Sequence, residues 1–479
     1  MSNNNNIARS GTKWMAVSSI VTAMVGLLRL AILTRFLEKS DFGVVAIITM
    51  ILGLTQMFSD LGFATAIMHK KDITKREFSS LYWIQFLLFL ILYVLITCFS
   101  GPIAVFYNED SLKVLIPISM LDLVFQGVGR LYGTILQKNF KFKTMSIRNV
   151  VCTISSVIIA VVLAYSGAGV YSLIFSSLFA TLSLNIWNFV EGQKNMHLSF
   201  CLSFKESIPL AKIGLYMTGA HILDYVAAKI DVLIIGRFLG MELLGIYSLA
   251  KELLQKIVSV VNSIANNVAL PFFSAKQDDD GLLCNMYCKL IHILTFITFP
   301  VLMFTTILAT PIIGIVYGAN FMDAAMIIVL LLVWALTMCI HNPIGSIVVA
   351  KGRTDLSFYY TIIRLLVMSL AVLITANISI NAVAFGQSVA SFIMFFVLFY
   401  MCLKKTIGLG LKNFISSFGK HGIVCLVFTA VFTPLVTLDI FGISNHILSF
   451  IIYGVITCGL YALVLFKYFK QDIYTIFNK

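Results

Sequence analysis

Six basic side chains lie inside long apolar stretches of this sequence. A charge at the centre of a bilayer costs about 2.5–3.5 kcal/mol on insertion scales, so such residues normally face a water-filled cavity or a polar partner. In a low-dielectric cavity, guanidinium and ammonium groups bind anions through charge-assisted hydrogen bonds. The six candidates for anion binding are Arg29, Arg130, Lys229, Lys251, Lys256 and Arg364.

Local pairing separates these cations. Lys256 follows Glu252 by four residues, the favourable order for a helical ion pair, so we expect the two to pair. Lys251 has no acidic residue three or four positions away and is the better candidate for a cavity cation. For Lys229 a cavity position and a structural partner remain equally open.

Other polar residues recur at helical spacing in the same stretches. Asp122, Gln126 and Arg130 follow at four-residue steps, which favours an internal network and leaves open a supporting role beside a site. His341 shares a face with Trp334 and Thr337, where a satisfied buried histidine is the ordinary interpretation. Three further rows carry polar residues that would cost free energy if they faced lipid, so we expect these rows to line a cavity. They are Ser18–Thr22–Arg29, Gln56–Asp60 and Lys251–Gln255–Ser259–Asn262–Asn266.

The composition identifies the elements that must position these residues. Of the 479 residues, 59% are hydrophobic and 11% charged, whereas soluble domains are about 45–50% apolar and about 25% charged. Spanning helices need about 20 apolar residues, and about fourteen such stretches occur between residues 14 and 468, among them 208–236, 242–270, 286–317 and 322–349. We therefore predict an all-α integral membrane protein whose function is built from helices, with no room for a soluble catalytic domain.

Lysine and arginine are unequally divided between the two sets of predicted loops. One set holds most of them, including Lys70, Lys138, Arg148 and Lys404, while the other holds only Arg35, Lys39, Lys113 and Arg237. The positive-inside rule places the rich set and both termini in the cytoplasm. The net charge of +13 then reflects topology, because the charges form no single basic face for nucleic acid. The N-terminal segment is interpreted as an uncleaved signal anchor.

The two halves of the sequence repeat each other. At an offset of 202, Arg35-Phe36-Leu37 falls on Arg237-Phe238-Leu239 and Gly43 falls on Gly245; at 216, Arg148 falls on Arg364. This predicts two six-helix lobes of the same topology with a pathway between them. The expected divisions are residues 1–190 and 208–402 for the lobes, 191–207 and 403–420 for cytoplasmic linkers, and 421–479 for two further helices and a tail.

Three segments carry a family resemblance: DVLIIGRFLGMELLGIYSLAKEL (231–253), ALPFFSAKQDD (269–279) and ILQKNFKF (135–142). The chain resembles the Wzx-like and WzxC-like polysaccharide flippases of the multidrug/oligosaccharidyl-lipid/polysaccharide exporter superfamily. The resemblance implies a two-lobed, V-shaped transporter in the bacterial inner membrane. It would turn an undecaprenyl-diphosphate-linked oligosaccharide from the cytoplasmic to the outer leaflet, beside membrane lipid and possible polymerase and glycosyltransferase partners.

A diphosphate that leaves water needs cations, and sugars need hydrogen-bonding and stacking groups. We expect Arg29 to bind phosphate through several hydrogen bonds and Lys251 to act on it as a point charge. The complete predicted substrate-binding set is Arg29, Lys251, Gln56, Asn262, Asn266, Tyr216, Gln126 and Arg130. The predicted gating or ion-coupling set is Asp60, Asp224, Asp231 and Glu252.

Arg29 and Asp231 are equivalent in the repeat and opposite in charge, so closing the outer side would bring them together as an ion pair. Substrate phosphates would then compete with Asp231 for Arg29 and break the pair. The alternative is a local pair between Asp231 and Arg237 or Lys229.

Two other functions stay open at this point. A cation-coupled multidrug exporter would use the acids of the gating set, although a basic cavity disfavours cationic drugs. A membrane enzyme acting on lipid-linked sugars would need acids in a sizeable loop, and the acidic run 278–280 resembles a solvated loop beside Lys276. We expect no cofactor and no metal, since Cys284 and Cys288 lack a second ligand pair and no phosphate-binding GxxxxGK[ST] motif occurs.

Overall fold

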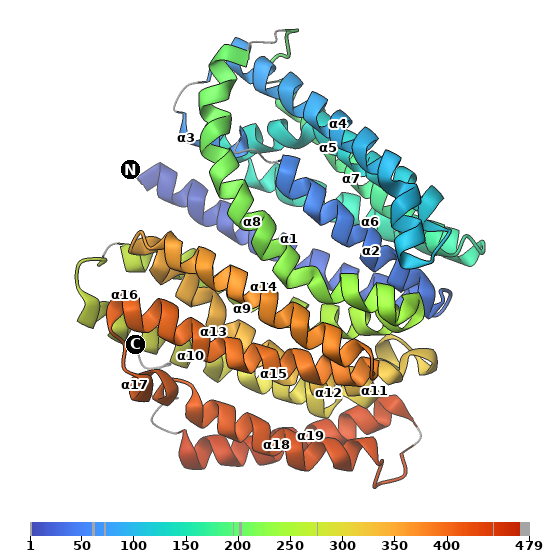
Figure 1. Ribbon diagram of the computed structural model, residues 1–479, viewed down its shortest axis with the longest axis vertical. Coiled ribbons are helices and arrows are strands. Elements are labelled where there is room, and N and C mark those ends of the chain that lie inside the picture. The colour runs from blue at the N-terminus through green and yellow to red at the C-terminus, as the bar shows by residue number, and fades with distance from the viewer. Residues whose placement is uncertain are drawn as a thin grey trace. The chain divides into compact units, whose positions relative to one another are not determined.

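The computed structural model describes the backbone of residues 2–59, 63–70, 73–194, 196–200, 204–274, 276–443 and 445–469. Within these ranges the side chains of 2–10, 12, 59, 65–66, 69, 204–218, 220–221, 260–268, 270–272 and 468 lie outside the description. Every regular element of the described residues is a helix (Figure 1). The chain divides into two compact units, residues 1–245 and 246–479.

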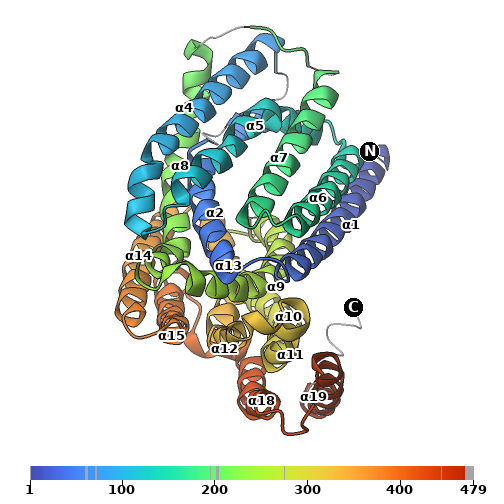
Figure 2. The ribbon, with the colours of Figure 1, turned by 90° about the vertical axis from the view of Figure 1, so that its right-hand side faces the viewer.

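The first unit contains eight helices and the start of a ninth. In it α1, α6 and α7 lie side by side (Figure 2), and α8 packs on α2 and α4. The elements are α1 (Ser2–Leu33), α2 (Lys39–Ser59), α3 (Phe63–His69), α4 (Lys75–Tyr107), α5 (Leu112–Lys138), α6 (Phe142–Tyr165), α7 (Val170–Gln193), α8 (Phe204–Phe238) and the first residues of α9 (Gly240–Ser274).

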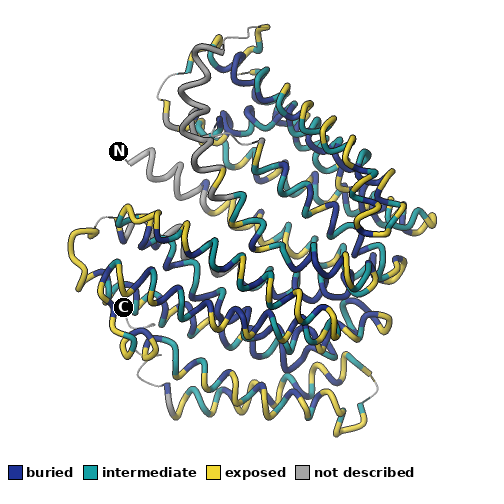
Figure 3. Tube along the Cα trace, viewed as in Figure 1, coloured by how far each residue is buried: buried dark blue, intermediate teal, exposed yellow. Residues whose placement is uncertain are grey.

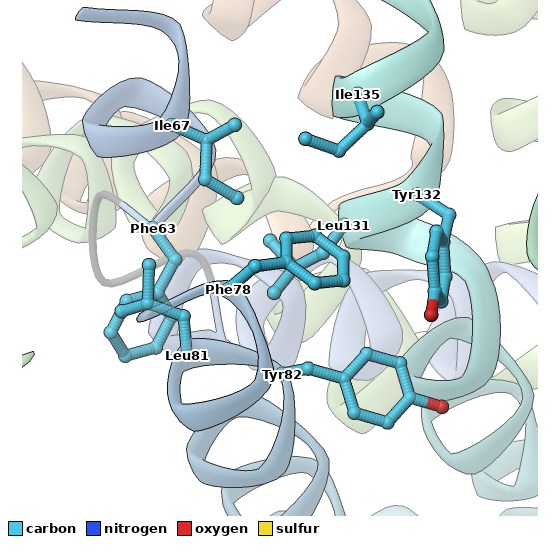
Figure 4. Packing of buried hydrophobic residues seen from close by; sticks show 8 residues of the cluster. All are labelled: Phe63, Ile67, Phe78, Leu81, Tyr82, Leu131, Tyr132 and Ile135. Atoms are coloured by element: carbon cyan, nitrogen blue, oxygen red, sulfur yellow. The ribbon is translucent and has the colours of Figure 1, made fainter. Parts of the chain in front are cut away.

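A buried hydrophobic cluster joins α3, α4 and α5 (Figure 4). Phe78 and Tyr82 of α4 contact Tyr132 of α5, with ring centroids 5.0 and 5.8 Å apart. All three rings are buried. Since each aromatic side chain buries a large apolar area, the cluster fixes α5 against α4.

The second unit continues α9 and ends with two helices outside the predicted repeat. These helices, α18 and α19, pack on α10 and α11 respectively. Exposed positions recur along both (Figure 3) and include Ile423, Val427 and Leu463, as expected for surfaces that face lipid. The further elements are α10 (Asp280–Ile307), α11 (Ala309–Val316), a 3₁₀ turn (Ala319–Phe321), α12 (Asp323–Leu330), α13 (Leu332–Ala350), α14 (Thr354–Ala376), α15 (Ile380–Leu398), a π-helical turn (Phe399–Lys404), α16 (Lys405–Ile407), α17 (Leu411–Ser416), α18 (Gly419–Thr437) and α19 (His446–Tyr468).

The predicted all-α membrane fold is confirmed. Among the described residues, 12 helices are long and apolar enough to cross a membrane. The predicted spans 208–236 and 242–270 fall on α8 and α9, which have 35 residues each. The protein is therefore a multi-pass membrane protein. Local boundaries differ: spans predicted at 286–317 and 322–349 are each interrupted, at Leu308 and Leu331.

The start of α2 crosses the start of α9 at the two repeat-related glycines. A β-carbon on Gly43 would overlap the carbonyl oxygen of Met241, and one on Gly245 would overlap that of Lys39. Met241 follows Lys39 by the same offset of 202, so the crossing is symmetric under the repeat. Only glycine lets two helix backbones approach this closely. An ion pair between Lys39 and Glu242, at 3.6 Å, borders the crossing.

The predicted topology can be tested by cysteine labelling in a variant without its native cysteines. Asp110 lies in the exposed loop before α5, and Arg76 is exposed at the start of α4. Because the charge pattern places these ends on opposite sides, a membrane-impermeant maleimide should label Asp110→Cys in intact cells and Arg76→Cys only after permeabilisation. Labelling of Arg76→Cys from outside would show that the assigned orientation is wrong.

Candidate functional site

The first unit contains an open cavity of about 740 Å³, lined by α2, α5, α6, α7 and α8. This volume is within the range of ligand-binding pockets. Its wall combines two cations and one carboxylate with many neutral polar groups. The lining residues are Thr49, Leu52, Gly53, Gln56, Asp122, Gln126, Arg130, Cys152, Thr153, Ser177, Ala180, Thr181, Leu184, Asn185, Asn188, Tyr225 and Lys229.

The polar row of α5 forms the internal network expected from its spacing. Gln126 Nε2 donates to Asp122 Oδ2 at 2.5 Å, and an Arg130 NH group donates to Gln126 Oε1 at 3.1 Å. The Asp122 carboxylate is thus engaged by Gln126, and the row ends on the Arg130 guanidinium at the cavity wall. The structure places predicted residues Gln56, Gln126 and Arg130 around one space.

Helix α8 contributes Lys229 and Tyr225 to the wall of the same cavity. Lys229 is partly buried and makes no ion pair or hydrogen bond with another residue in the described ranges. The Tyr225 hydroxyl donates to the carbonyl oxygen of Met50 at 3.1 Å and would overlap a β-carbon at Gly53. Gly53 therefore provides the notch in which Tyr225 holds α8 against α2, and the structure resolves the open question on Lys229 in favour of a cavity position.

A polar row on α7 also lines the cavity and is absent from the predicted site residues. Ser177, Thr181, Asn185 and Asn188 follow at steps of four, four and three residues and all line the cavity. Their spacing carried the same helical signal as the row on α5. None of its members is charged, and the rows predicted from the sequence to line a cavity each contain a charged residue.

Arg148 corrects a sequence-based assignment. It was grouped with the cytoplasmic loop residues, yet it lies within α6 and is only 4% exposed. Its guanidinium donates to the side-chain oxygens of Asn149 and Asn188, the latter on α7. Its repeat equivalent, Arg364, is also buried, at 8% exposure in α14. The two amide oxygens accept hydrogen bonds from Arg148 inside the helix bundle. The position of Arg148 close to a predicted loop gave no sign that its side chain is buried.

Arg29 lies in the first unit but not among the residues that line this cavity. Its guanidinium donates to Ser176 Oγ at 2.8 Å and to the carbonyl oxygen of Leu173 at 3.2 Å, both on α7. Asp231 is fully buried in α8, and Asp224 is exposed. The substrate role of Arg29 and the gating roles of the two aspartates stay predictions.

Lys251 belongs to the second unit. It is 5% exposed, and its ammonium group lies 5.0 Å from the ring centroid of Trp334 and 5.7 Å from that of Tyr247. Cation–π contacts of this kind partly replace the hydration of a buried cation. Its proposed phosphate contact stays a prediction.

The expected ion pair between Lys256 and Glu252 forms at 2.9 Å, and the ion-coupling role of Glu252 stays a prediction. Asp60 and the side chains of Tyr216, Asn262 and Asn266 lie outside the described residues.

Other candidates from the sequence have ordinary structural partners. The Tyr360 hydroxyl lies 3.4 Å from His341 Nδ1, so this half-buried histidine has a hydrogen-bonding partner. The thiols of Cys284 and Cys288 lie within hydrogen-bonding distance of the carbonyl oxygens of Ile407 and Asn413.

A family model described as polysaccharide biosynthesis protein matches residues 32–326, more than half of the chain. The chain belongs to this family. Among curated relatives of the chain, an uncharacterized membrane protein in the cps region of Klebsiella pneumoniae is 28% identical over 95% of this chain and 94% of its own. The lipopolysaccharide biosynthesis protein WzxC of Escherichia coli K12 is 24% identical over 85% of this chain and 83% of its own.

The fold of this chain also matches a solved structure. The lipid II flippase MurJ, in an inward closed conformation, aligns with a TM-score of 0.68 and 16% identity over 94% of this chain and 99% of its own. These matches confirm the predicted resemblance to Wzx-like polysaccharide flippases and the all-helical transporter fold.

Proposed function

We propose that this protein turns a lipid-linked oligosaccharide across the bacterial inner membrane, from the cytoplasmic to the outer leaflet, and that the cavity of the first unit holds its diphosphate. Family membership and the names of the relatives support the transport of a polysaccharide precursor. The observation that carries the assignment of the site is the placement of Arg130 and Lys229 on one polar cavity wall. Undecaprenyl diphosphate is the carrier that the family resemblance implies.

The charge balance of the cavity favours an anionic ligand. Among its lining residues Arg130 and Lys229 are cationic and Asp122 is the one acid, which Gln126 already engages. Charge-assisted hydrogen bonds from a guanidinium and an ammonium group would offset the loss of phosphate hydration. The same charges oppose a cationic drug, so the alternative of a multidrug exporter is disfavoured. The protein acts on its substrate by moving it, and we assign no covalent chemistry to the site.

The test measures leaflet transfer in proteoliposomes. The probe is an undecaprenyl-diphosphate-linked disaccharide with a fluorophore on the sugar, and an impermeant quencher reports the fraction left in the outer leaflet. Because each lost charge-assisted hydrogen bond is worth about 1.5–3 kcal/mol, Arg130→Gln and Lys229→Gln should each slow transfer by roughly tenfold or more. Lys113→Gln, which removes an exposed lysine paired with Asp110, is the matched control.

Two outcomes would contradict the proposal. Wild-type protein that transfers no probe would remove the function, and cavity variants as fast as Lys113→Gln would remove the site. Arg29→Gln and Lys251→Gln, measured in parallel, test the phosphate assignment made from the sequence alone. If these two variants lose transfer while Arg130→Gln and Lys229→Gln keep it, the diphosphate site lies with Arg29 and Lys251.

A further inference from the structure

We infer that the row Ser177–Thr181–Asn185–Asn188 on α7, here called the α7 row, binds the sugar next to the diphosphate through the hydroxyl groups of that sugar. This inference rests on the proposed function. The members line the cavity as neutral hydroxyl and amide groups. Eleven residues of α-helix rise about 16 Å, so the row is long enough to follow more than one sugar ring.

The hydrogen bonds that the α7 row already makes leave a mixed set of donors and acceptors for a ligand. Asn188 Oδ1 accepts from Arg148, which leaves the amide hydrogens of Asn188 as donors. Asn185 Nδ2 donates to the carbonyl oxygen of Thr181 at 2.8 Å, which leaves its Oδ1 as an acceptor. The hydroxyl of Thr181 is already hydrogen-bonded to the Asp122 carboxylate, whereas the hydroxyl of Ser177 makes no hydrogen bond with another described residue. Sugar hydroxyls both donate and accept, so such a set fits them.

Close packing of α5 on α7 holds the row in register with Arg130. A β-carbon on Gly129 would overlap the backbone of Asn185, and one on Gly133 would lie 3.1 Å from Asn188 Nδ2. Gly129 immediately precedes Arg130, so the backbone of Arg130 lies at the level of Asn185, and its guanidinium reaches one turn back to Gln126. A diphosphate on Arg130 would then have its first sugar beside the α7 row, which lines the same cavity.

Preorganisation supports a role in recognition. Asn185 and Asn188 are 4% and 3% exposed, and each is fixed by a hydrogen bond to its own helix or to Arg148. Side chains held in place before binding lose little entropy when a ligand arrives. No member of the α7 row is charged, so the row itself binds a sugar through hydrogen bonds to its hydroxyl groups.

The test compares the affinity of the purified protein for two fluorescent probes: undecaprenyl diphosphate without sugar, and the same lipid carrying a neutral disaccharide. Wild-type protein should bind the glycosylated probe at least tenfold more tightly. Ser177→Ala and the nearly isosteric Asn185→Leu should each reduce this preference severalfold, and together they should abolish it. Affinity for the bare lipid should stay unchanged. Ser183→Ala, on α7 but not among the lining residues, is the matched control.

The Lys229→Gln variant distinguishes the two assignments, because loss of a phosphate contact should weaken both probes equally. The inference is overturned if the α7-row variants keep the wild-type preference, or if they weaken both probes to the same extent as a general defect would. Wild-type protein that binds neither probe overturns the proposed function together with this inference. Wild-type protein that binds both probes equally overturns the inference alone.

Discussion

Replacing Gly245 with leucine is expected to force α9 away from α2 and to lower the stability of the folded protein by about 3 kcal/mol, at the upper end of overpacking effects. A β-carbon at this position would overlap the carbonyl oxygen of Lys39 and lie 3.0 Å from the backbone nitrogen of Gly43. Both obstacles are backbone atoms, so no change of side-chain rotamer relieves the clash. The two helices themselves must separate.

The measurement is the midpoint of thermal unfolding in detergent, together with the leaflet-transfer rate. Gly26→Leu is the matched control, because a β-carbon on this glycine of α1 meets nothing within 4 Å. Its stability should stay unchanged or rise by up to about 1 kcal/mol, since leucine has the higher helix propensity. Equal midpoints for Gly245→Leu and Gly26→Leu would show that the crossing is not tightly packed.

Replacing Arg148 with alanine is expected to cost about 3 kcal/mol of stability, because hydrogen bonds to charged groups are worth about 1.5–3 kcal/mol each. The guanidinium donates to Asn149 Oδ1 through two nitrogens, at 2.8 and 3.2 Å, and to Asn188 Oδ1 through a third. Its removal leaves two amide oxygens without these donors and opens a hole between α6 and α7.

Thermal unfolding in detergent again provides the measurement. Lys143→Ala, an exposed position on the same helix, should change stability by no more than about 0.5 kcal/mol. Arg148→Lys should recover part of the loss, because it keeps the charge but cannot reproduce the three-nitrogen contact. An Arg148→Ala midpoint equal to that of Lys143→Ala would contradict a structural role for this arginine.

Patterns confined to one helix predicted the fold class and the contacts within that helix correctly. The apolar stretches indicated an all-helical membrane protein because a bilayer leaves every backbone group to be satisfied within its own helix. Helical geometry makes side chains four residues apart neighbours. The spacing of Asp122, Gln126 and Arg130 therefore indicated their network, and that of Glu252 and Lys256 indicated their ion pair. Partners one turn apart on one helix need no knowledge of any other helix.

Contacts between side chains on different helices depend on the tertiary structure. The spacing of Ser177, Thr181, Asn185 and Asn188 shows a polar face on α7, but only the packing of α5 on α7 makes that face a cavity wall. The repeat pairs Gly43 with Gly245 without showing that the two helices cross there.

The contrast between Arg29 and Lys229 has the same origin. Each is a cation within an apolar stretch, yet Arg29 donates to α7 while Lys229 lines the cavity. A sequence determines which side chains share a helix face, because helical geometry is fixed. Which neighbour that face meets depends on how the helices pack, since the partners lie far apart along the chain.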